Sequence, residues 1–411
     1  MALPTKQEVS DLVASLGEVA KGYADTPDLE GYMSRVQIIA KAKELVRTLT
    51  TPDQIPNYHG LNMAELIAIR TFMRLGVLDA IPKTGAISLT DLAKATGAQE
   101  SLLERMARIL VATGFLDQTL PTGGAYKHTK FSLSYLLDRP SPGHLFLAMY
   151  DDWFKHMVAF DDYLAARGLP DSAREPDDPL HNPYTFGSGQ DGTPVWAIMA
   201  QNPERLDSFQ KGMAGIDVAI PVVGHFDFGV LADDDGTGEK RVQLVDVGGG
   251  HGVVLSKILT AHPTLDPGRT VLQERADVIG LAKTNGVLPG EVRLMEHDFM
   301  TEQPVKGAKA YFMRMILHDY ADAVGIDILK RLADAMARDS RVLVCEMVLA
   351  SRVGEHDFAS AVLDQAVMTM GGKERTEEGF RSMLEAAGLE LVQTWRAPGV
   401  PGGCVEGRLR R

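Results

Sequence analysis

Apolar residues in the first part of the chain recur at helical spacing. Between residues 30 and 49 the positions that follow this period are Met33, Val36, Ile39, Ala40 and Leu45. Pro52 lies just beyond the run, so residues 1–50 are predicted to be helical. A helix of this length must bury its apolar stripe against a partner subunit or against the chain's own core, and the sequence leaves both alternatives open.

The next segment, residues 60–140, has the pattern of a winged helix. The pattern predicts three helices, over 61–81, 88–97 and 99–114. They are followed by a β-hairpin with strands over 114–119 and 125–129. Pro82 ends the first of these helices. Winged helices often bind DNA through the second helix of the helix-turn-helix. The charge on the outer face of that helix, residues 99–114, therefore bears on whether this chain binds DNA.

That outer face is not basic. It carries Glu100 and Glu104 beside Arg105 and Arg108, and the whole chain has a formal net charge of −13. Phosphate neutralisation requires clustered Lys and Arg, so a structural or dimerisation role is favoured over DNA binding.

From about residue 240 onward, strands and helices alternate. Strands are expected at 241–248, 269–274, 291–299, 308–316 and 341–349, with helices at 252–263, 276–286, 321–337 and 376–388, and an antiparallel pair at 388–399 and 404–411. Repeated strand–helix units predict a parallel, doubly wound sheet with right-handed crossovers. Ligands of such sheets bind beyond the carboxyl ends of the strands.

The chain is therefore predicted to have an α/β fold, with a doubly wound, Rossmann-like domain at its C-terminus preceded by a mostly helical winged-helix domain. The chain is predicted to divide into a helical extension (1–55), the winged helix (56–140), a helical linker (141–235) and the α/β domain (236–411). The linker is rich in methionine and aromatic residues, and its stretch at about 168–194 is expected to be irregular. Its apolar side chains either line an adaptable pocket or form ordinary core.

Composition and length narrow the class of protein. The chain has 411 residues, of which 45% are hydrophobic and 24% charged, values typical of a soluble globular protein. Its two cysteines, Cys345 and Cys404, form no disulfide framework and fit a reducing compartment. The N-terminus lacks a signal-peptide pattern, and no apolar run approaches the roughly 18 residues that span a bilayer. We expect a cytoplasmic protein with neither a membrane nor a nucleic acid as partner.

The stretch LVDVGGGHG, residues 244–252, contains the most specific local signal. Its spacing is G-x-G-x-G, whereas a dinucleotide fingerprint would place its third glycine at the position of Val253. Glu274 ends the second predicted strand, where a carboxylate could bind ribose hydroxyls, and Asp298 and Phe299 end the third. No P-loop lysine or arginine cluster accompanies the loop. A nucleoside that carries a cation, S-adenosylmethionine, therefore fits better than a diphosphate, and Asp246 is expected to bind backbone N–H groups.

Three further residues are expected at the same edge of the sheet. His318 follows the fourth predicted strand, Glu346 ends the fifth, and Glu374 precedes the last helix. A histidine can deprotonate a hydroxyl near neutral pH, and a carboxylate on its far nitrogen would fix the tautomer. A simpler role for the His318–Asp319 pair is helix capping, but the two glutamates favour catalysis.

Four segments in this order, residues 244–252, 271–279, 296–320 and 371–380, resemble the small-molecule O-methyltransferases of plants and fungi. The fungal secondary-metabolism branch is the most similar, and the resemblance covers about residues 60–411. It implies a winged-helix dimerisation domain, a homodimer, and S-adenosylmethionine as cofactor without a metal.

The resemblance also implies roles for particular residues. Cofactor contacts are implied for Gly248, Gly250, Glu274, Asp298, Phe299 and Arg314, where Glu274 replaces the usual Asp and Arg314 replaces the Lys of the plant enzymes. His251 occupies a position that is often Thr. His318 is implied as general base, with Glu346 and Glu374 flanking it. The acceptor pocket would include Phe209, Met213, Trp153 and Met149.

The expected function is methyl transfer to a phenolic hydroxyl of a small aromatic or polyketide-type secondary metabolite. Two alternatives stay open. One is an enzyme of the same fold that binds the cofactor but catalyses pericyclic or dehydration chemistry. The other is a winged-helix regulator.

Overall fold

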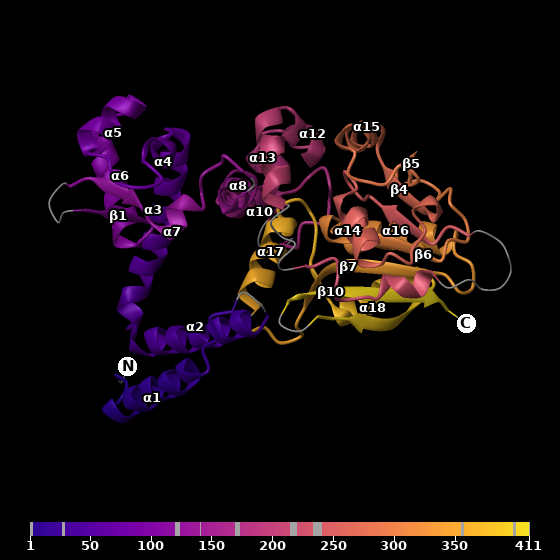
Figure 1. Ribbon diagram of the computed structural model, residues 1–411, viewed down its shortest axis with the longest axis horizontal. Helices are drawn as coiled ribbons and strands as arrows, with labels where there is room; N and C mark the ends of the chain where they lie inside the picture. The colour runs from indigo at the N-terminus through magenta and orange to yellow at the C-terminus, as the bar shows by residue number, and fades with distance from the viewer. Residues whose placement is uncertain are drawn as a thin grey trace. The chain divides into compact units, whose positions relative to one another are not determined.

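The computed structural model describes residues 3–26, 29–119, 124–139, 141–168, 173–213, 220–232, 241–354, 357–397 and 400–410. The chain forms two compact units (Figure 1). Unit one comprises residues 1–152 and 204–215, and unit two comprises residues 153–203 and 216–411. Within the described residues, no helix is long and apolar enough to cross a membrane.

Unit one is helical apart from one hairpin. Its helices are α1 (Lys6–Lys21), α2 (Leu29–Leu49), α3 (Ile55–Arg74), α4 (Val77–Ala80), α5 (Leu89–Thr96), α6 (Glu100–Ala112), α7 (Lys130–Leu133), α8 (Pro142–Ala148) and α13 (Pro203–Met213). Strands β1 (Leu116–Gln118) and β2 (Tyr126–His128) pair antiparallel, as predicted for the wing. The helices and the hairpin share one hydrophobic core, in which the side chains of Phe72, Leu103 and Leu110 are fully buried.

One predicted helix of this unit is interrupted. The continuous helix expected over residues 61–81 ends at Arg74, and α4 begins after Gly76. Gly76 has φ 66°, a left-handed conformation that glycine adopts without steric cost and that cannot continue a helix. The apolar period crosses this break, which is why periodicity alone merged the two helices.

Unit two contains the sheet and a small helical segment. The segment comprises α9 (Lys155–Met157), α10 (Phe160–Ala166), α11 (Pro183–Gly187) and α12 (Val195–Ala200), preceded by a π-helical turn at Met149–Phe154 that spans the boundary between the units. The stretch at 168–194 is therefore less irregular than expected, because it includes α11.

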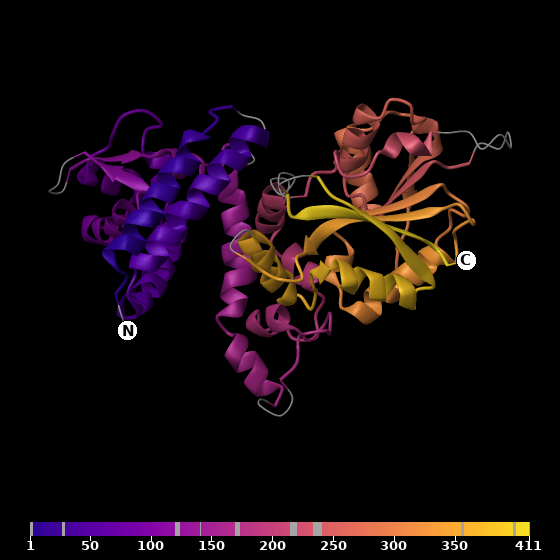
Figure 2. The ribbon, with the colours of Figure 1, turned by 90° about the horizontal axis from the view of Figure 1, so that it is seen from below.

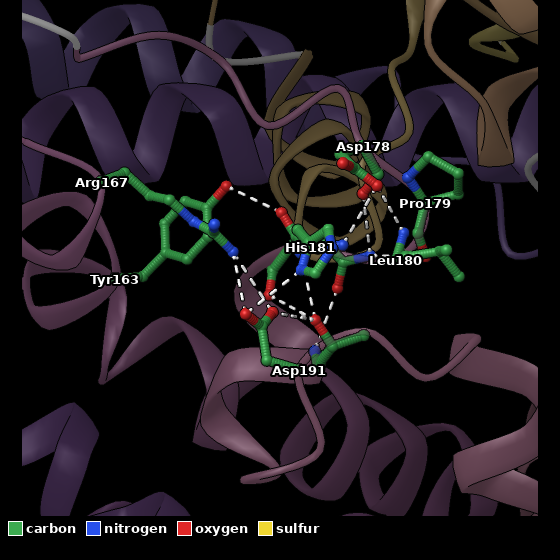
Figure 3. A network of polar contacts seen from close by, with 9 residues as sticks. Tyr163, Arg167, Asp178, Pro179, Leu180, His181 and Asp191 are labelled. Atoms are coloured by element: carbon green, nitrogen blue, oxygen red, sulfur yellow. Dashed lines mark hydrogen bonds and ion pairs between the residues drawn. The ribbon is translucent and has the colours of Figure 1, made fainter.

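A polar network holds this stretch in place (Figure 3). The carboxylate of Asp191 accepts a hydrogen bond from Arg167, 3.2 Å, and lies 3.2 Å from His181 Nδ1. The Asp178 carboxylate accepts backbone N–H bonds from Leu180 and His181, at 2.8 and 3.2 Å. Polar side chains thus fix a loop that periodicity could not resolve.

The sheet has the strand order β5-β4-β3-β6-β7-β10-β9, and β8 pairs with β7. Its strands are β3 (Leu244–Val247), β4 (Thr270–Glu274), β5 (Arg293–Glu296), β6 (Ala310–Arg314), β7 (Arg341–Leu349), β8 (Arg375–Thr376), β9 (Leu389–Trp395) and β10 (Gly402–Leu409). Strands β3 to β7 are mutually parallel, and β10 is antiparallel to β7 and β9. The predicted α/β fold class is confirmed.

Helices cover both faces of this sheet (Figure 2). They are α14 (Val253–Ala261), α15 (Ala276–Asn285), α16 (Asp322–Ala333), α17 (Phe358–Met368) and α18 (Glu377–Ala386), of which α17 was not predicted, nor was the short strand β8. Successive residues of β3 belong to different buried clusters. Val245 shares one cluster with Leu329 of α16, and Leu244 shares the other with Leu255 of α14. Cys345 and Cys404 are opposite each other in β7 and β10 as buried free thiols.

Candidate active site

The strand order places the site at a topological switch point. From β3 the chain proceeds outward through β4 to β5, and then β6 pairs with the other side of β3. The crevice of a doubly wound sheet opens where the order reverses. Two segments leave the sheet there: the glycine loop, residues 248–252, follows β3, and the base loop, residues 315–320, follows β6.

The glycine loop has a backbone that side chains would obstruct. Gly248 and Gly250 have φ values of 72° and 59°, in the left-handed region. A Cβ on Gly248 would lie 2.7 Å from the Ile316 side chain and 3.5 Å from the Phe299 ring. The loop therefore passes close to the base loop and to Phe299, and leaves bare backbone at the edge of the sheet.

Asp246 lies beneath this loop as a buried carboxylate. A Cβ on Gly249 would overlap that carboxylate, and Oδ2 has no hydrogen-bond partner among the described residues. Burial raises the pKa of Asp246 to about 7, with a contribution from the charge of Glu274, while Arg314 opposes the shift. The expected bonds from backbone N–H groups to this acid are not seen in the described part of the chain, so that interpretation was wrong.

Glu274 is anchored where the second strand ends. One carboxylate oxygen accepts from Gly250 N, 3.2 Å, and the other from Arg275 N, 2.8 Å. Strand β5 ends at Glu296, earlier than predicted, so Asp298 and Phe299 lie in the following loop. Asp298 accepts from Met300 N, 2.9 Å, and the Phe299 ring packs edge-on against Tyr320.

The arginines beside the glycine loop are engaged by the protein itself. Arg314 donates to the carbonyl of Ile220, 2.9 Å, and Arg275 forms an ion pair with Asp277, 3.0 Å. Both therefore have protein partners, which favours a nucleoside without a diphosphate at this edge.

His318 and Glu374 form a buried pair. His318 Nδ1 donates to Glu374 Oε1 at 2.7 Å, and both side chains are at most 6% exposed. A carboxylate only accepts, so this bond leaves the proton of the neutral ring on Nδ1 and the lone pair on Nε2. The structure thus brings together two residues that are 56 positions apart in the sequence.

Asp319 occupies the other side of the imidazole, where its Oδ1 lies 3.4 Å from Nε2. Burial alone would lower the pKa of His318, but the carboxylates of Asp319, Glu374 and Glu346 outweigh it and raise that pKa to about 10. Burial likewise raises the pKa of Glu346 to about 7. At neutral pH His318 is therefore an imidazolium, with a proton on each ring nitrogen.

Glu346 was predicted to end its strand, but it lies within β7. Arg314, the last residue of β6, pairs with Cys345, so Glu346 is the first β7 residue beyond its β6 neighbour. Its Oε1 accepts from the backbone N–H groups of Ile316, Leu317 and His318, at 3.1, 2.6 and 3.3 Å. Glu346 thus binds the backbone of the base loop, and no hydrogen bond joins it to the imidazole within the described chain.

The four residues predicted for the acceptor pocket are half-buried. Phe209 and Met213 lie on α13 and Met149 at the start of the π-helical turn, all in unit one, whereas Trp153 belongs to unit two. The Trp153 indole N–H has no partner among the described residues. Their role as acceptor contacts stays a prediction.

Sequence reasoning missed two residues that contact this site. Asp319 was interpreted as capping or supporting, yet it faces the imidazole. Arg375 lies within the matching segment 371–380 and was assigned no role, yet its buried guanidinium binds the base loop. The adjacency of each to a predicted site residue was the available signal. Among the described residues, no group of three His, Cys, Asp or Glu side chains could hold a metal ion.

Fold and site together are those of a Rossmann-like methyltransferase with a winged-helix domain. Comparison with known proteins agrees: the O-methyltransferase domain family matches residues 169–390, and the O-methyltransferase dimerisation domain family matches residues 62–138. The chain belongs to the S-adenosylmethionine-dependent O-methyltransferase family, so the predicted enzyme class and cofactor are confirmed.

One relative is a fungal methyltransferase, and two solved structures share the fold. Methyltransferase cfoD of Aspergillus candidus is 35% identical over 387 residues, which cover 92% of this chain and 93% of cfoD. The crystal structure of OxaC in complex with SAH and oxaline superimposes with a TM-score of 0.85 at 26% identity, over 98% of both chains. LepI in complex with SAM, at 22% identity and a TM-score of 0.78 over 98% of this chain and 99% of LepI, shares the fold.

Proposed function

We propose that this enzyme transfers the methyl group of S-adenosylmethionine to a phenolic hydroxyl of an aromatic or polyketide-type secondary metabolite, with His318 as general base. The observation that carries the proposal is the bond of 2.7 Å between Glu374 and His318, whose loop is adjacent to the glycine loop. A bound oxaline in the OxaC structure and the fungal origin of cfoD support a secondary metabolite as acceptor.

The residues at the switch point fit the cofactor. Gly248 and Gly250 would admit it to the backbone, Glu274 would bind the ribose, and Asp298 with Phe299 would hold the adenine. Arg314 would fix the adjacent wall through its bond to Ile220. The cofactor supplies an electrophilic sulfonium methyl group, so the protein needs only to align and deprotonate the attacking hydroxyl.

In this scheme the acceptor hydroxyl meets Nε2 of His318. The bound cofactor would supply the methyl group and leave as the neutral thioether when its sulfur–methyl bond breaks. In the neutral form of His318, Nε2 would take the hydroxyl proton while Nδ1 keeps its hydrogen bond to Glu374. Glu374 stabilises the resulting imidazolium, and Asp319 at 3.4 Å can bind the same hydroxyl. Phe209, Met213, Trp153 and Met149 would supply apolar contacts to the acceptor ring.

The test is turnover with a methyl-labelled cofactor and a panel of hydroxylated aromatic acceptors. His318→Ala should lower kcat by about 10²- to 10⁴-fold, the range of general base catalysis, while the cofactor dissociation constant stays within about twofold. Labelled product that forms at a normal rate in this variant would contradict the base assignment.

A second candidate is supported by the proton that His318 holds. Nε2 of His318 lies 3.4 Å from Asp319, and the surrounding carboxylates raise the pKa of His318 to about 10, so the imidazolium is a hydrogen-bond donor suited to dehydration or pericyclic chemistry on a bound substrate. The same labelled incubation separates the two, because this reaction would consume substrate without incorporating label.

We also propose that the protein is a homodimer. Among the described residues, none of the buried hydrophobic core precedes Ala68, although α1, α2 and most of α3 lie there. Their exposed side chains include Tyr32, Ile39, Val46, Leu49, Ile55 and Tyr58. These elements lead directly into the region that matches the dimerisation family, which supports a second copy of this chain as the group that covers them.

A further inference from the structure

Arg375 is a guanidinium buried next to the catalytic pair. It follows Glu374 directly, and its side chain is 1% exposed. Its Nη1 donates to the carbonyl of Leu317, 2.9 Å, and its Nη2 to that of Tyr320, 2.7 Å. These two carbonyls flank His318, so one side chain holds the base loop on both sides of the base.

The same guanidinium also binds its own segment and α16. Nη1 donates to the carbonyl of Lys373, 3.0 Å, and Nε to Asp322 Oδ1, 2.8 Å. Four hydrogen bonds thus use most of the five N–H donors of the fork. A lysine ammonium lacks this planar geometry and could not reach all four acceptors.

The segment that carries Glu374 lies directly against the base loop. Lys373 N donates to the carbonyl of His318, 2.8 Å, and a Cβ on Gly372 would overlap that carbonyl. The contact between the two segments is therefore backbone against backbone. Arg375 extends it to both sides of His318.

The base loop needs such support because it is strained. Met315 has φ 56°, and among the described residues it is the one non-glycine residue with a positive φ. Such a conformation persists only where neighbouring groups impose it. Glu346 binds three N–H groups of the loop from β7, and Arg375 binds two carbonyls from the opposite segment.

We propose that Arg375, anchored by Asp322, is a positioning residue that holds the His318 loop against the Glu374 segment and so sets the contact between imidazole and carboxylate. The proposal rests on the proposed function, in which His318 is the base. Arg375 acts through His318 and contacts no reacting atom.

A cavity beside this arginine allows a direct test. It has a volume of about 390 Å³ and is lined by Arg375, Asp322, Lys373 and Glu175, among others. Truncation of Arg375 would extend this cavity toward the base loop. A free guanidinium ion could then occupy the vacated position and restore the bonds to Leu317 and Tyr320.

The experiment compares Arg375→Ala and Arg375→Lys with Arg341→Ala as control. Arg341 also lies on the sheet and forms an ion pair with Glu406, 2.7 Å, and within the described part of the chain no hydrogen bond or ion pair joins it to the base loop. Arg375→Ala should lower kcat about 100-fold, the cost of a small misplacement, with little change in the cofactor dissociation constant. Added guanidinium should recover activity in Arg375→Ala alone, and Arg375→Lys should stay impaired.

The pKa of His318 gives a readout that does not depend on turnover. It is faced by Asp319 from its own loop, by Glu374 from the segment before α18 and by Glu346 from β7, with Arg375 behind them. If Arg375 holds Glu374 against the ring, Arg375→Lys, which keeps the positive charge and loses only the planar fork, should lower this pKa, measured by NMR on protein with isotope-labelled histidine. His318→Ala identifies the resonance by its loss.

A milder variant decides the matter if Arg375→Ala does not fold. Asp322→Asn removes the charge that anchors the Arg375 guanidinium. Like the Arg375 variants, it should lower both kcat and the pKa of His318. Unchanged kcat and pKa in a folded Arg375 or Asp322 variant would overturn the proposal. If the wild-type enzyme transfers no methyl group while the NMR shift occurs, the proposed function fails and the positioning role stands.

Discussion

At the scale of single residues, the activity of the site depends on how many protons are bound to a small cluster of titratable side chains. One imidazole is faced by three carboxylates, those of Glu374, Asp319 and Glu346, within a buried region. Their charges raise the pKa of His318 to about 10, whereas burial raises the pKa of Glu346 to about 7 and also raises that of Asp319. A base must be neutral to accept a proton, so this cluster ties activity to pH.

The pH dependence has a definite sign. Because the pKa of His318 is raised, the neutral ring becomes more abundant as pH increases from 7 toward about 10, and kcat/KM should increase over that window. Glu374→Gln removes one of the charges that raise this pKa. It should shift the acid limb of the profile to lower pH by about one to three units, the effect of one nearby opposite charge, and also lower the maximum rate.

The control for this prediction is Glu378→Gln, which removes an exposed carboxylate from the following helix, α18. Its profile should superimpose on that of the wild type. A limb that stays in place in Glu374→Gln, or that moves equally in both variants, would show that Glu374 does not set the proton affinity of His318.

At the scale of elements, the strand order explains why distant motifs meet. The glycine loop follows β3 and the base loop follows β6, and these strands are neighbours although about 60 residues of chain separate the loops. Alternating strands and helices predicted this arrangement, because parallel strands place their carboxyl ends at one edge. His318 and Glu374 could be predicted as neighbours on the same grounds.

Other features of the site depend on register and backbone geometry, which periodicity does not carry. Glu346 could not be assigned to the loop backbone, since that contact follows from the pairing of Arg314 with Cys345. The positive φ of Met315 and the break at Gly76 are local conformations that the apolar period does not report. Arg375 was overlooked because its partners are carbonyl groups, which every residue has.

The glycine loop supplies the prediction at this scale. Gly249→Ala places a methyl group onto the Asp246 carboxylate and Leu272, so the loop or the strand beneath it must shift. A shift that costs about 1–3 kcal/mol should weaken cofactor binding about 10- to 100-fold. Isothermal titration with the demethylated cofactor product would measure this loss.

The matched control is Gly280→Ala in the neighbouring helix α15. A Cβ at that position meets nothing within 4 Å. This variant should bind the cofactor normally and gain about 0.5–1 kcal/mol in stability, because glycine destabilises a helix interior. Normal cofactor affinity in Gly249→Ala would show that the loop does not contact the cofactor.

At the scale of the whole molecule, the N-terminal helices stand out because they bury so little. Helices α1 and α2 form a pair, yet within the described residues neither contributes to the buried hydrophobic core. On α2, Tyr32, Ile39 and Val46 are spaced by seven residues, which places them on one face, and all are at least 40% exposed. The proposed dimer interface would bury an apolar stripe of this kind.

The same stripe continues past the end of α2. Val46 also lines a cavity of about 340 Å³ with Ile55 and Tyr58, at the start of α3. The sequence left open whether the first helix packs on a partner or on its own core, and the absence of buried apolar residues before Ala68 in the described chain favours a partner. With the dimerisation family matching residues 62–138, a second copy of this chain is the expected partner.

The stripe on α2 makes assembly sensitive to a single buried charge. Ile39→Asp introduces a charge into the centre of the stripe, where burial of an unpaired carboxylate should raise the dimer dissociation constant by at least about 100-fold. Gln37→Asp introduces the same charge on the opposite side of α2, about 160° away at 100° per residue, and should leave assembly unchanged. Sedimentation equilibrium over a range of concentrations measures both variants beside the wild type. A wild-type monomer, or a dimer that both variants weaken equally, would contradict α2 as the interface. If the stripe does form it, Ile39→Asp alone should dissociate the protein, and activity measured at the same concentrations would show whether one subunit suffices for methyl transfer.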